Sequence, residues 1–304
     1  MRSPRIITTL LFLMMIPFAS NAQRANWRHF RYEVSFGAGA SNFLGDLGGA
    51  NQIGTHFFKD LEFSLTRWVF DVSMRYKVSE FIAVKTNLMY GRVKGDDRLT
   101  EEFYRHHRNL SFRSDIFEAS AYLEASFMRE QGSHRYHIRN VRGQKGYEIY
   151  TYGFIGLGGF HFNPEARYQG KWYELQPLGT EGQGIDPAKN KYHRFQLTIP
   201  VGIGIKYSLD ERYGIGMEFG VRRTFTDYID DVSTNYFEGD QLQNKHGDIA
   251  KILADRSTYP ASYEGRVNAP GEQRGNPNFT DAYMFLIFNL NYKLRTTRGN
   301  LPKL

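Results

Sequence analysis

The stretch FQLTIPVGIGIKY at residues 195–207 alternates strictly between two kinds of side chain. Large apolar residues take every second position from Phe195 to Tyr207, and Gln, Thr, Pro, Gly and Lys take the positions between them. A period of two puts the two kinds on opposite faces of a β-strand, and about ten residues suffice for a tilted strand to cross a membrane. After a short turn at 208–212, YGIGMEFGVR (213–222) repeats the alternation. Together the two segments predict an antiparallel hairpin with one continuous apolar face.

The same alternation recurs along the rest of the chain and predicts eight strands in all. The expected strands are 32–41, 68–77, 82–92, 111–127, 147–162, 195–207, 213–222 and 282–294. For the glycine-rich 147–162 segment the pattern does not decide which face points outward. Short connections alternate with long ones, which are 42–64, 93–110, 163–194 and 226–280. Short turns at one end and long loops at the other are typical of an outer-membrane barrel with its termini in the periplasm.

The charged residues decide which face of the sheet points inward. A soluble β-sandwich or a lipocalin-like barrel also alternates, but it keeps its apolar face inside. Here the less apolar face carries Asp71, Arg75, Lys85, Glu118, Glu124, Lys206, Glu218 and Arg222. These are too many charges for a dry core. We therefore expect an all-β fold, an eight-stranded antiparallel up-and-down transmembrane β-barrel with long extracellular loops and an apolar exterior in lipid.

Composition excludes several other classes of protein. The 304 residues include no cysteine, which excludes disulfide frameworks and thiol chemistry. A mean hydropathy of −0.53 excludes a protein with several apolar membrane helices. Aromatic residues make up 15% of the sequence, whereas disordered chains contain few of them, so a disordered chain is excluded. We expect these side chains to lie in an apolar environment.

The chain ends carry targeting and charge signals. Arg2 and Arg5 precede an apolar run from Ile6 to Phe18, and Ala22 ends a small-residue cleavage motif. This pattern predicts a cleaved signal peptide at 1–22. The remaining organisation is a basic periplasmic lead-in at 23–31, the barrel at 32–294 and a basic periplasmic tail at 295–304. The expected location is the cell outer membrane, with outer-membrane lipid as a partner.

The expected interior indicates that the protein is not a channel, and the candidate catalytic motifs do not indicate an enzyme. Eight strands leave a lumen that side chains nearly fill, and the inward cations and anions are roughly matched in number. His106 and His107 lie near acidic residues, but no fixed spacing links them to a nucleophile. GLGG at 156–159 lies in a strand with no helix after it, so it is no phosphate-binding loop. We expect no catalytic residue, no cofactor and no nucleic-acid partner.

Three aspartates in TFTDYIDDVS form the one candidate metal site. Asp227, Asp230 and Asp231 follow the seventh strand and could offer oxygen ligands to Ca²⁺. Their spacing lacks the regularity of a calcium-binding loop. Turn and capping hydrogen bonds are the simpler interpretation.

Basic residues gather at the expected periplasmic end. Those beyond the lead-in that could dock a partner are Arg129, Arg135, Arg139, Arg142, Arg295 and Arg298. They could simply attract anionic lipid head groups of the inner leaflet. Alternatively, they could bind an acidic periplasmic partner. The sequence leaves both interpretations open.

Four stretches are more specific than the alternation of the strands. They are SNFLGDLGG (41–49), YGFIGLGGFHFNPEARYQGKWYELQPLGTEGQG (152–184), IPVGIGIKYSLDERYGIGMEFGVRRTFTDYIDDVS (199–233) and RGNPNFTDAYMF (274–285). Together they resemble a family of Bacteroidota outer-membrane β-barrels that includes the PorG component of the type IX secretion system. The resemblance implies an eight-stranded barrel and a role as component or membrane anchor of a secretion complex, with periplasmic secretion-ring proteins as partners.

The resemblance also assigns family-motif positions, which are Gly45, Asp46, Gly179, Glu181, Gly182, Asp227, Asp230 and Asp231. Glycine and aspartate at these positions suit fixed turns at the outer rim and carry no catalytic role. The alternative function is a structural or ligand- and surface-binding outer-membrane barrel with no secretion role. A lipid-modifying enzyme is a third hypothesis.

Overall fold

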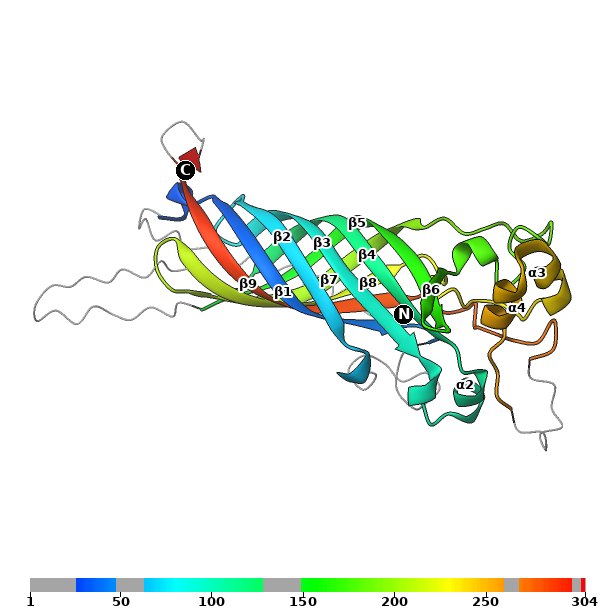
Figure 1. Cartoon of the computed structure of the whole chain (residues 1–304). Helices are drawn as coiled ribbons and strands as arrows, with labels where there is room; N and C mark the ends of the chain where they lie inside the picture. Colours follow the sequence, from blue (N-terminus) through cyan, green and yellow to red (C-terminus); the bar gives the residue numbers. More distant parts are fainter. Residues whose placement is uncertain (1–25, 48–62, 128–148, 260–267, 297–301, 304) are drawn as a thin grey trace, which may run out of the picture.

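A computed structural model describes residues 26–47, 63–127, 149–259, 268–296 and 302–303. Its barrel strands are β1 (Tyr32–Leu44), β2 (Arg67–Lys77), β3 (Ile82–Asp96), β4 (Ser111–Ser126), β5 (Ile149–Tyr168), β7 (Phe195–Ser208), β8 (Tyr213–Thr224) and β9 (Ala282–Thr296). Each strand pairs antiparallel with its neighbours, and β1 also pairs with β9 from Tyr32↔Leu294 to Leu44↔Ala282. This last pairing closes the sheet, so the predicted eight-stranded up-and-down barrel is confirmed (Figure 1).

The strands start where the sequence pattern predicts but several run further. The strand β5 continues to Tyr168 and folds back onto β6 (Lys171–Glu174). The last strand ends at Thr296, so Arg295, expected in the tail, lies in β9, and β10 (Pro302–Lys303) pairs with it. In β5 the outward residues become polar at Asn163, Glu165 and Arg167, so the strand continues beyond the apolar outward face by which the sequence pattern had located it.

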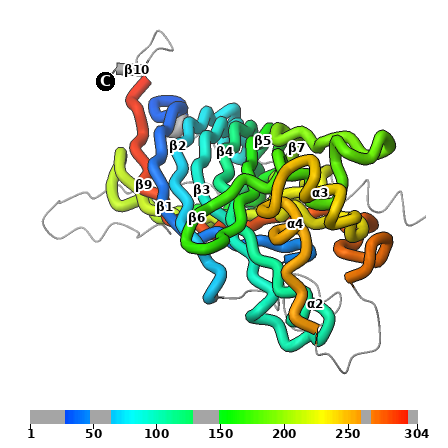
Figure 2. The backbone as a smooth tube through the Cα atoms, turned by 45° about the vertical axis from the view of Figure 1, so that its right-hand side comes forward, coloured from blue at the N-terminus to red at the C-terminus, as the bar shows by residue number. Residues whose placement is uncertain are grey.

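Short helices lie beyond the strands at one end of the barrel. They are α2 (Phe103–Arg108), α3 (Gly239–His246) and α4 (Asp248–Ala254), with the 3₁₀ turns η3 (Asp97–Leu99) and η4 (Gln176–Leu178). Figures 1 and 2 show α3 and α4 packed together at the end opposite the start of β1 and the end of β9. We call this end the cap end and the other the terminal end. Two more 3₁₀ turns, η1 (Asn26–His29) and η2 (Phe63–Leu65), flank β1 and β2.

The outer surface of the barrel is apolar. Leu157, Ile203 and Phe288 are 72%, 66% and 60% exposed, and they lie on three different strands. The undecided faces of β5 are now assigned, because Ile155 and Leu157 point outward whereas Tyr152 and Phe154 are buried. A soluble protein would not expose so many large apolar side chains together. The exterior therefore has the character of a lipid-facing surface.

Inward-facing charges fill the terminal half of the lumen. Arg75 Nη1 lies 2.7 Å from Glu33 Oε1, and its Nε lies 2.6 Å from Glu124 Oε2. Lys206 Nζ contacts the other oxygen of Glu33 at 2.6 Å. Both acids are 0% exposed and Lys206 is 1% exposed. The predicted ion-paired interior is confirmed for this half of the barrel.

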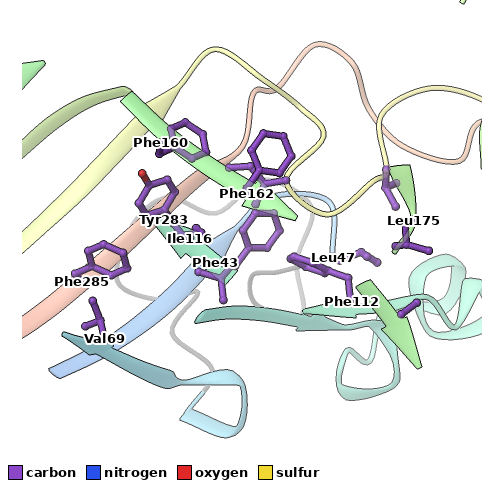
Figure 3. Packing of buried hydrophobic residues seen from close by; sticks show 14 of the residues in the cluster. Phe43, Leu47, Val69, Phe112, Ile116, Phe160, Phe162, Leu175, Tyr283 and Phe285 are labelled. Atoms are coloured by element: carbon purple, nitrogen blue, oxygen red, sulfur yellow. The ribbon is translucent and has the colours of Figure 1, made fainter. Parts of the chain in front are cut away.

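An apolar plug fills the other half, which the sequence interpretation did not anticipate. Figure 3 shows Phe43, Phe112, Phe160, Phe162 and Tyr283 converging from different strands inside the cap end. Inward glycines of β7 and β8 make room mainly for aromatic rings, since a Cβ at Gly204 would meet the Tyr152 ring and one at Gly202 the Phe154 ring. At Gly220 a Cβ would meet both the Arg222 guanidinium and the Phe154 ring, so aromatic and charged side chains share this space.

Among the described residues, no helix is long and apolar enough to cross a membrane.

Candidate functional site

The segments that join the strands at the cap end interlock into one folded unit. We call this unit the cap; its described parts are 45–47, 97–110, 169–194, 225–259 and 268–281. All eight family-motif positions lie in it, although they come from connections far apart in the sequence. The cap is therefore the place where the resemblance-bearing segments meet.

Glu181 is a hydrogen-bonding centre of the cap. Its carboxylate accepts from the backbone N–H groups of Ser233 and Thr234 at 2.9 and 3.0 Å, and from Thr234 Oγ1 at 2.7 Å. It also forms an ion pair with Arg274 Nη1 at 3.0 Å, and both side chains are buried. Arg274 in turn donates to the carbonyl oxygens of Asp231 and Ala254. One buried ion pair thus connects the 169–194 segment to both ends of the 225–281 connection.

Arg108 forms a second hydrogen-bonding centre, which no motif in the sequence indicated. Its Nε donates to Asp97 Oδ2 at 2.8 Å, while its Nη1 and Nη2 donate to the carbonyl oxygens of Arg274 and Asp46 at 2.6 and 2.7 Å. Burial lowers the pKa of Arg108, but the charge of Asp97 and its hydrogen bonds outweigh burial and raise the pKa. Because the carbonyl partners lie 62 and 166 positions away, only the folded chain brings them together.

Four carboxyl groups gather where the cap meets the strand ends. Asp46 accepts from Asn276 N at 2.6 Å, Asp230 from Leu47 N at 3.0 Å and Asp281 from Ile229 N at 2.8 Å. Burial raises the pKa of Asp227 to about 8, and the charges of Asp46 and Glu181 add to the effect. Burial likewise raises the pKa of Asp230 and Asp281, and the other acids of the group raise it further. These acids therefore hold protons more tightly than ordinary aspartates.

Asp231 has hydrogen-bond partners rather than metal-like neighbours. It accepts from Thr180 Oγ1 at 2.5 Å and from Tyr192 Oη at 2.7 Å. Burial raises its pKa to about 6, although Arg274 and these two hydrogen bonds lower it. In the described part of the chain, no three acidic or histidine side chains are placed to hold a metal ion. Asp230 accepts from Val232 N at 3.0 Å, a turn hydrogen bond of the expected kind, whereas the hydroxyl partners of Asp231 lie in the 169–194 segment.

The motif glycines permit close approach of neighbouring segments. Gly182 has a φ of +88°, and a Cβ there would overlap the Phe237 ring. A Cβ on Gly45 would overlap Asp281 and the ring of Phe43. Gly179 ends η4 in the left-handed region. These three glycines therefore contribute to the packing and turns of the cap.

The other residues singled out from the sequence are only partly described. Arg129, Arg135, Arg139, Arg142 and Arg298 lie outside the described residues, whereas Arg295 is exposed at the terminal end. The ring nitrogens of His106 and His107 face the carbonyl oxygens of Thr100 and Phe103. Both histidines therefore contact backbone carbonyl oxygens in or just before α2, and neither of these contacts involves a nucleophile.

Several solved structures of known proteins are similar in fold to this chain, at low sequence identity. No protein-family profile and no curated protein sequence matches the chain. Among solved structures, it is similar to Ail, the attachment invasion locus protein of Yersinia pestis (9% identity, TM-score 0.37, 86% of this chain and 97% of that chain). It is also similar to Neisserial surface protein A (11%, 0.37, 86% and 96%) and to the N-terminal β-barrel domain of Pseudomonas aeruginosa OprF (10%, 0.31, 86% and 97%). None of these matches links the chain to PorG or to Bacteroidota, and none carries a functional argument.

Proposed function

We propose that the protein is a closed, non-enzymatic outer-membrane barrel that anchors a protein secretion complex of the type IX kind. The observation that carries the anchoring role is the ionic network across the lumen, in which Arg75 bridges Glu33 and Glu124 with all three side chains at most 3% exposed. A lumen filled in this way gives secreted chains and solutes no path. A barrel that lets nothing pass through its lumen is expected to act by binding partners at its surface.

The apolar exterior supports the outer-membrane location. Along β2, outward side chains run from Trp68 to Tyr76, which at a tilt of about 40° corresponds to roughly 20 Å along the barrel axis. Tyrosines Tyr32 and Tyr76 pack at 5.0 Å near the terminal end, and Trp68 and Tyr90 at 5.3 Å near the cap end. Aromatic side chains at both edges of an apolar band are typical of outer-membrane barrels. The terminal end then faces the periplasm.

The secretion role rests on the resemblance of the four motif segments and on the basic terminal end. A surplus of arginines at this end suits an acidic surface on a periplasmic ring protein. Attraction to inner-leaflet lipid would use the same charges but would leave no co-purifying protein.

Affinity purification in mild detergent separates these possibilities. We expect periplasmic ring proteins to co-purify with the wild-type barrel and to be depleted by the R295Q/R298Q variant or by deletion of 295–304. The matched control is K245Q/K251Q, which removes the same charge from the cap. Deletion of the whole gene should reduce protein secretion, and normal secretion in that strain would contradict the proposal.

Two further measurements test the closed and non-enzymatic character. Planar-bilayer recordings of the purified protein should show no stable, large conductance. The lipid profile of the deletion strain should match that of the wild type. A changed profile would instead favour a lipid-modifying enzyme.

The cap favours a second candidate function, a binding barrel with no secretion role. The buried ion pairs of Glu181 with Arg274 and of Asp97 with Arg108 hold the connections in one arrangement. A fixed outer surface suits recognition of a ligand or another cell surface. This candidate predicts intact secretion together with altered adhesion in the deletion strain.

A further inference from the structure

Aromatic side chains form a continuous outward row near the cap end of the barrel. The register pairs Phe70 with Tyr90, Tyr90 with Phe117, Phe117 with His161 and His161 with Phe195. All five side chains are exposed. The row crosses five neighbouring strands and marks the cap-side edge of the apolar belt over that part of the barrel.

Charged residues follow directly beyond this row. The next outward positions on β3 and β4 are Arg92 and Asp115, about 7 Å further along the strands. On β1 and β9 the next outward residues along this register, Ala40 and Leu286, are apolar, whereas β8 carries one outward cation, Arg223. Most of the outward charges near the cap end therefore lie on β3 to β6. We call this surface the charged wall; it consists of Arg92, Lys94, Arg113, Asp115, Glu165, Arg167, Lys171, Trp172 and Glu174.

Two arginines of the charged wall are held in fixed positions. Arg92 donates to Asp115 from Nε at 2.5 Å and from Nη2 at 2.9 Å. Arg113 contacts Glu165 at 2.8 Å, and its guanidinium carbon lies 3.6 Å from the ring centroid of Trp172. A guanidinium has five N–H donors, and these contacts use two on each arginine. Both are thus oriented in advance for a further anionic acceptor.

Cations outnumber anions on the charged wall, five to three. Arg167 and Lys171 are exposed at the β5–β6 hairpin, and neither forms an ion pair with another described residue. Arginine forks match phosphate geometry, and lysine adds positive charge. The charged wall lies on the side of the barrel and is continuous with the lipid-facing belt. It therefore lies at the depth expected for lipid head groups.

We propose that the charged wall binds the phosphate groups of a phosphorylated glycolipid in the outer leaflet. The inference rests on the proposed outer-membrane location, whose leaflet at the cap end supplies this lipid. Apolar side chains of the belt contact the acyl chains, and Arg92, Arg113, Arg167 and Lys171 contact the phosphates.

Lipid binding to the full-length barrel in nanodiscs of zwitterionic phospholipid tests the proposal. Native mass spectrometry would compare a diphosphorylated lipid A with the same lipid lacking both phosphates. We expect the phosphorylated lipid to bind at least tenfold more tightly. The R113Q/R167Q/K171Q variant should lose at least tenfold of that affinity, since each cation near an anionic surface contributes about fivefold.

The control K191Q/K245Q/K251Q removes the same charge from exposed positions of the cap, outside the charged wall, and should change the affinity less than twofold. Folding of each variant is checked by the altered gel mobility of the unheated barrel. Equal binding of the lipid without phosphates, or an equal loss in the control, would overturn the proposal. If the wild-type barrel failed to insert into bilayers at all, the proposed location would fail as well, so the two failures are distinguishable.

Discussion

Lys85 Nζ donates hydrogen bonds to both carboxylate oxygens of Glu218, at 2.6 and 2.7 Å, across the lumen from β3 to β8. The two residues lie 133 positions apart in the sequence. Glu218 also accepts a hydrogen bond from Tyr152 and lies 3.8 Å from Arg75. One carboxylate thereby joins four strands, so several contacts depend on Glu218 at once.

Removing Glu218 should strongly destabilise the barrel. Glu218→Ala leaves Lys85 charged and buried without its partner, which costs about 3–5 kcal/mol of unfolding free energy. The double variant K85M/E218L should lose less, because no unpaired charge remains. Urea unfolding in detergent measures both. Glu211→Ala, in the exposed β7–β8 turn, is the control, and an equal loss there would contradict the role of the network.

Breaking the Glu181–Arg274 pair should loosen the cap while the barrel stays folded. Arg274→Gln leaves the Glu181 carboxylate buried without its cation, although its backbone hydrogen bonds remain. We expect at least tenfold faster chymotrypsin cleavage within 225–281. Lys251→Gln breaks only the exposed pair with Asp240 and should cleave at the wild-type rate. Unchanged cleavage of the Arg274→Gln variant would show that this pair does not hold the cap closed.

Alkaline pH should weaken the cap. The pKa of Asp227 is about 8 in the folded protein against an ordinary 3.8, so the folded state holds the proton more tightly. Its contribution to stability is complete below about pH 4 and is lost as pH rises to about 8. Chymotrypsin cleavage of the cap, corrected with an unfolded substrate, should therefore accelerate up to pH 8, by at most about tenfold per pH unit for one proton.

Asp227→Asn removes one of the titrations in this group of acids and should make the pH profile less steep. Above pH 8 the variant cap should be more stable than the wild-type cap by about 1–3 kcal/mol, the usual cost of a poorly satisfied buried polar group. Asp186→Asn, in the 169–194 segment of the cap, should keep the wild-type profile. A variant with the wild-type pH dependence would mean that Asp227 is not the titrating group.

A charge on the lipid-facing belt should impair insertion. Leu157 points outward from the middle of the belt and is 72% exposed. Leu157→Arg should cost about 2–4 kcal/mol of folding into bilayers, the value for arginine near the membrane midplane. Asn244→Arg on the exposed surface of α3 should insert normally. Folding into liposomes, followed by gel mobility, distinguishes them, and equal yields would place Leu157 outside the lipid.

The cap shows where sequence reasoning reaches its limit. The short helix α4 follows from local sequence, because Asp248–Ala254 contains no glycine or proline. The pairing of Arg108 with Asp97, and its bonds to the carbonyl oxygens of Asp46 and Arg274, could not be predicted locally. Arg274 and Asp281 lie in the stretch 274–285 that carries the family resemblance, but their hydrogen-bond partners are set by long-range packing. Local sequence specifies turns and helices, whereas these contacts need the connections to be brought together by the closed barrel.

By itself, the sequence determined the barrel. Alternation over eight segments fixes the strand number. In every strand but the glycine-rich 147–162, the charges on the less apolar face also fix the inward face and the lipid-facing exterior, because side chains alternate across a strand. Only the tertiary structure decided how the lumen is divided between an ionic network and an aromatic plug, and how the cap closes. Those features depend on which inward side chains meet across the barrel, and closure of β1 on β9 sets that register.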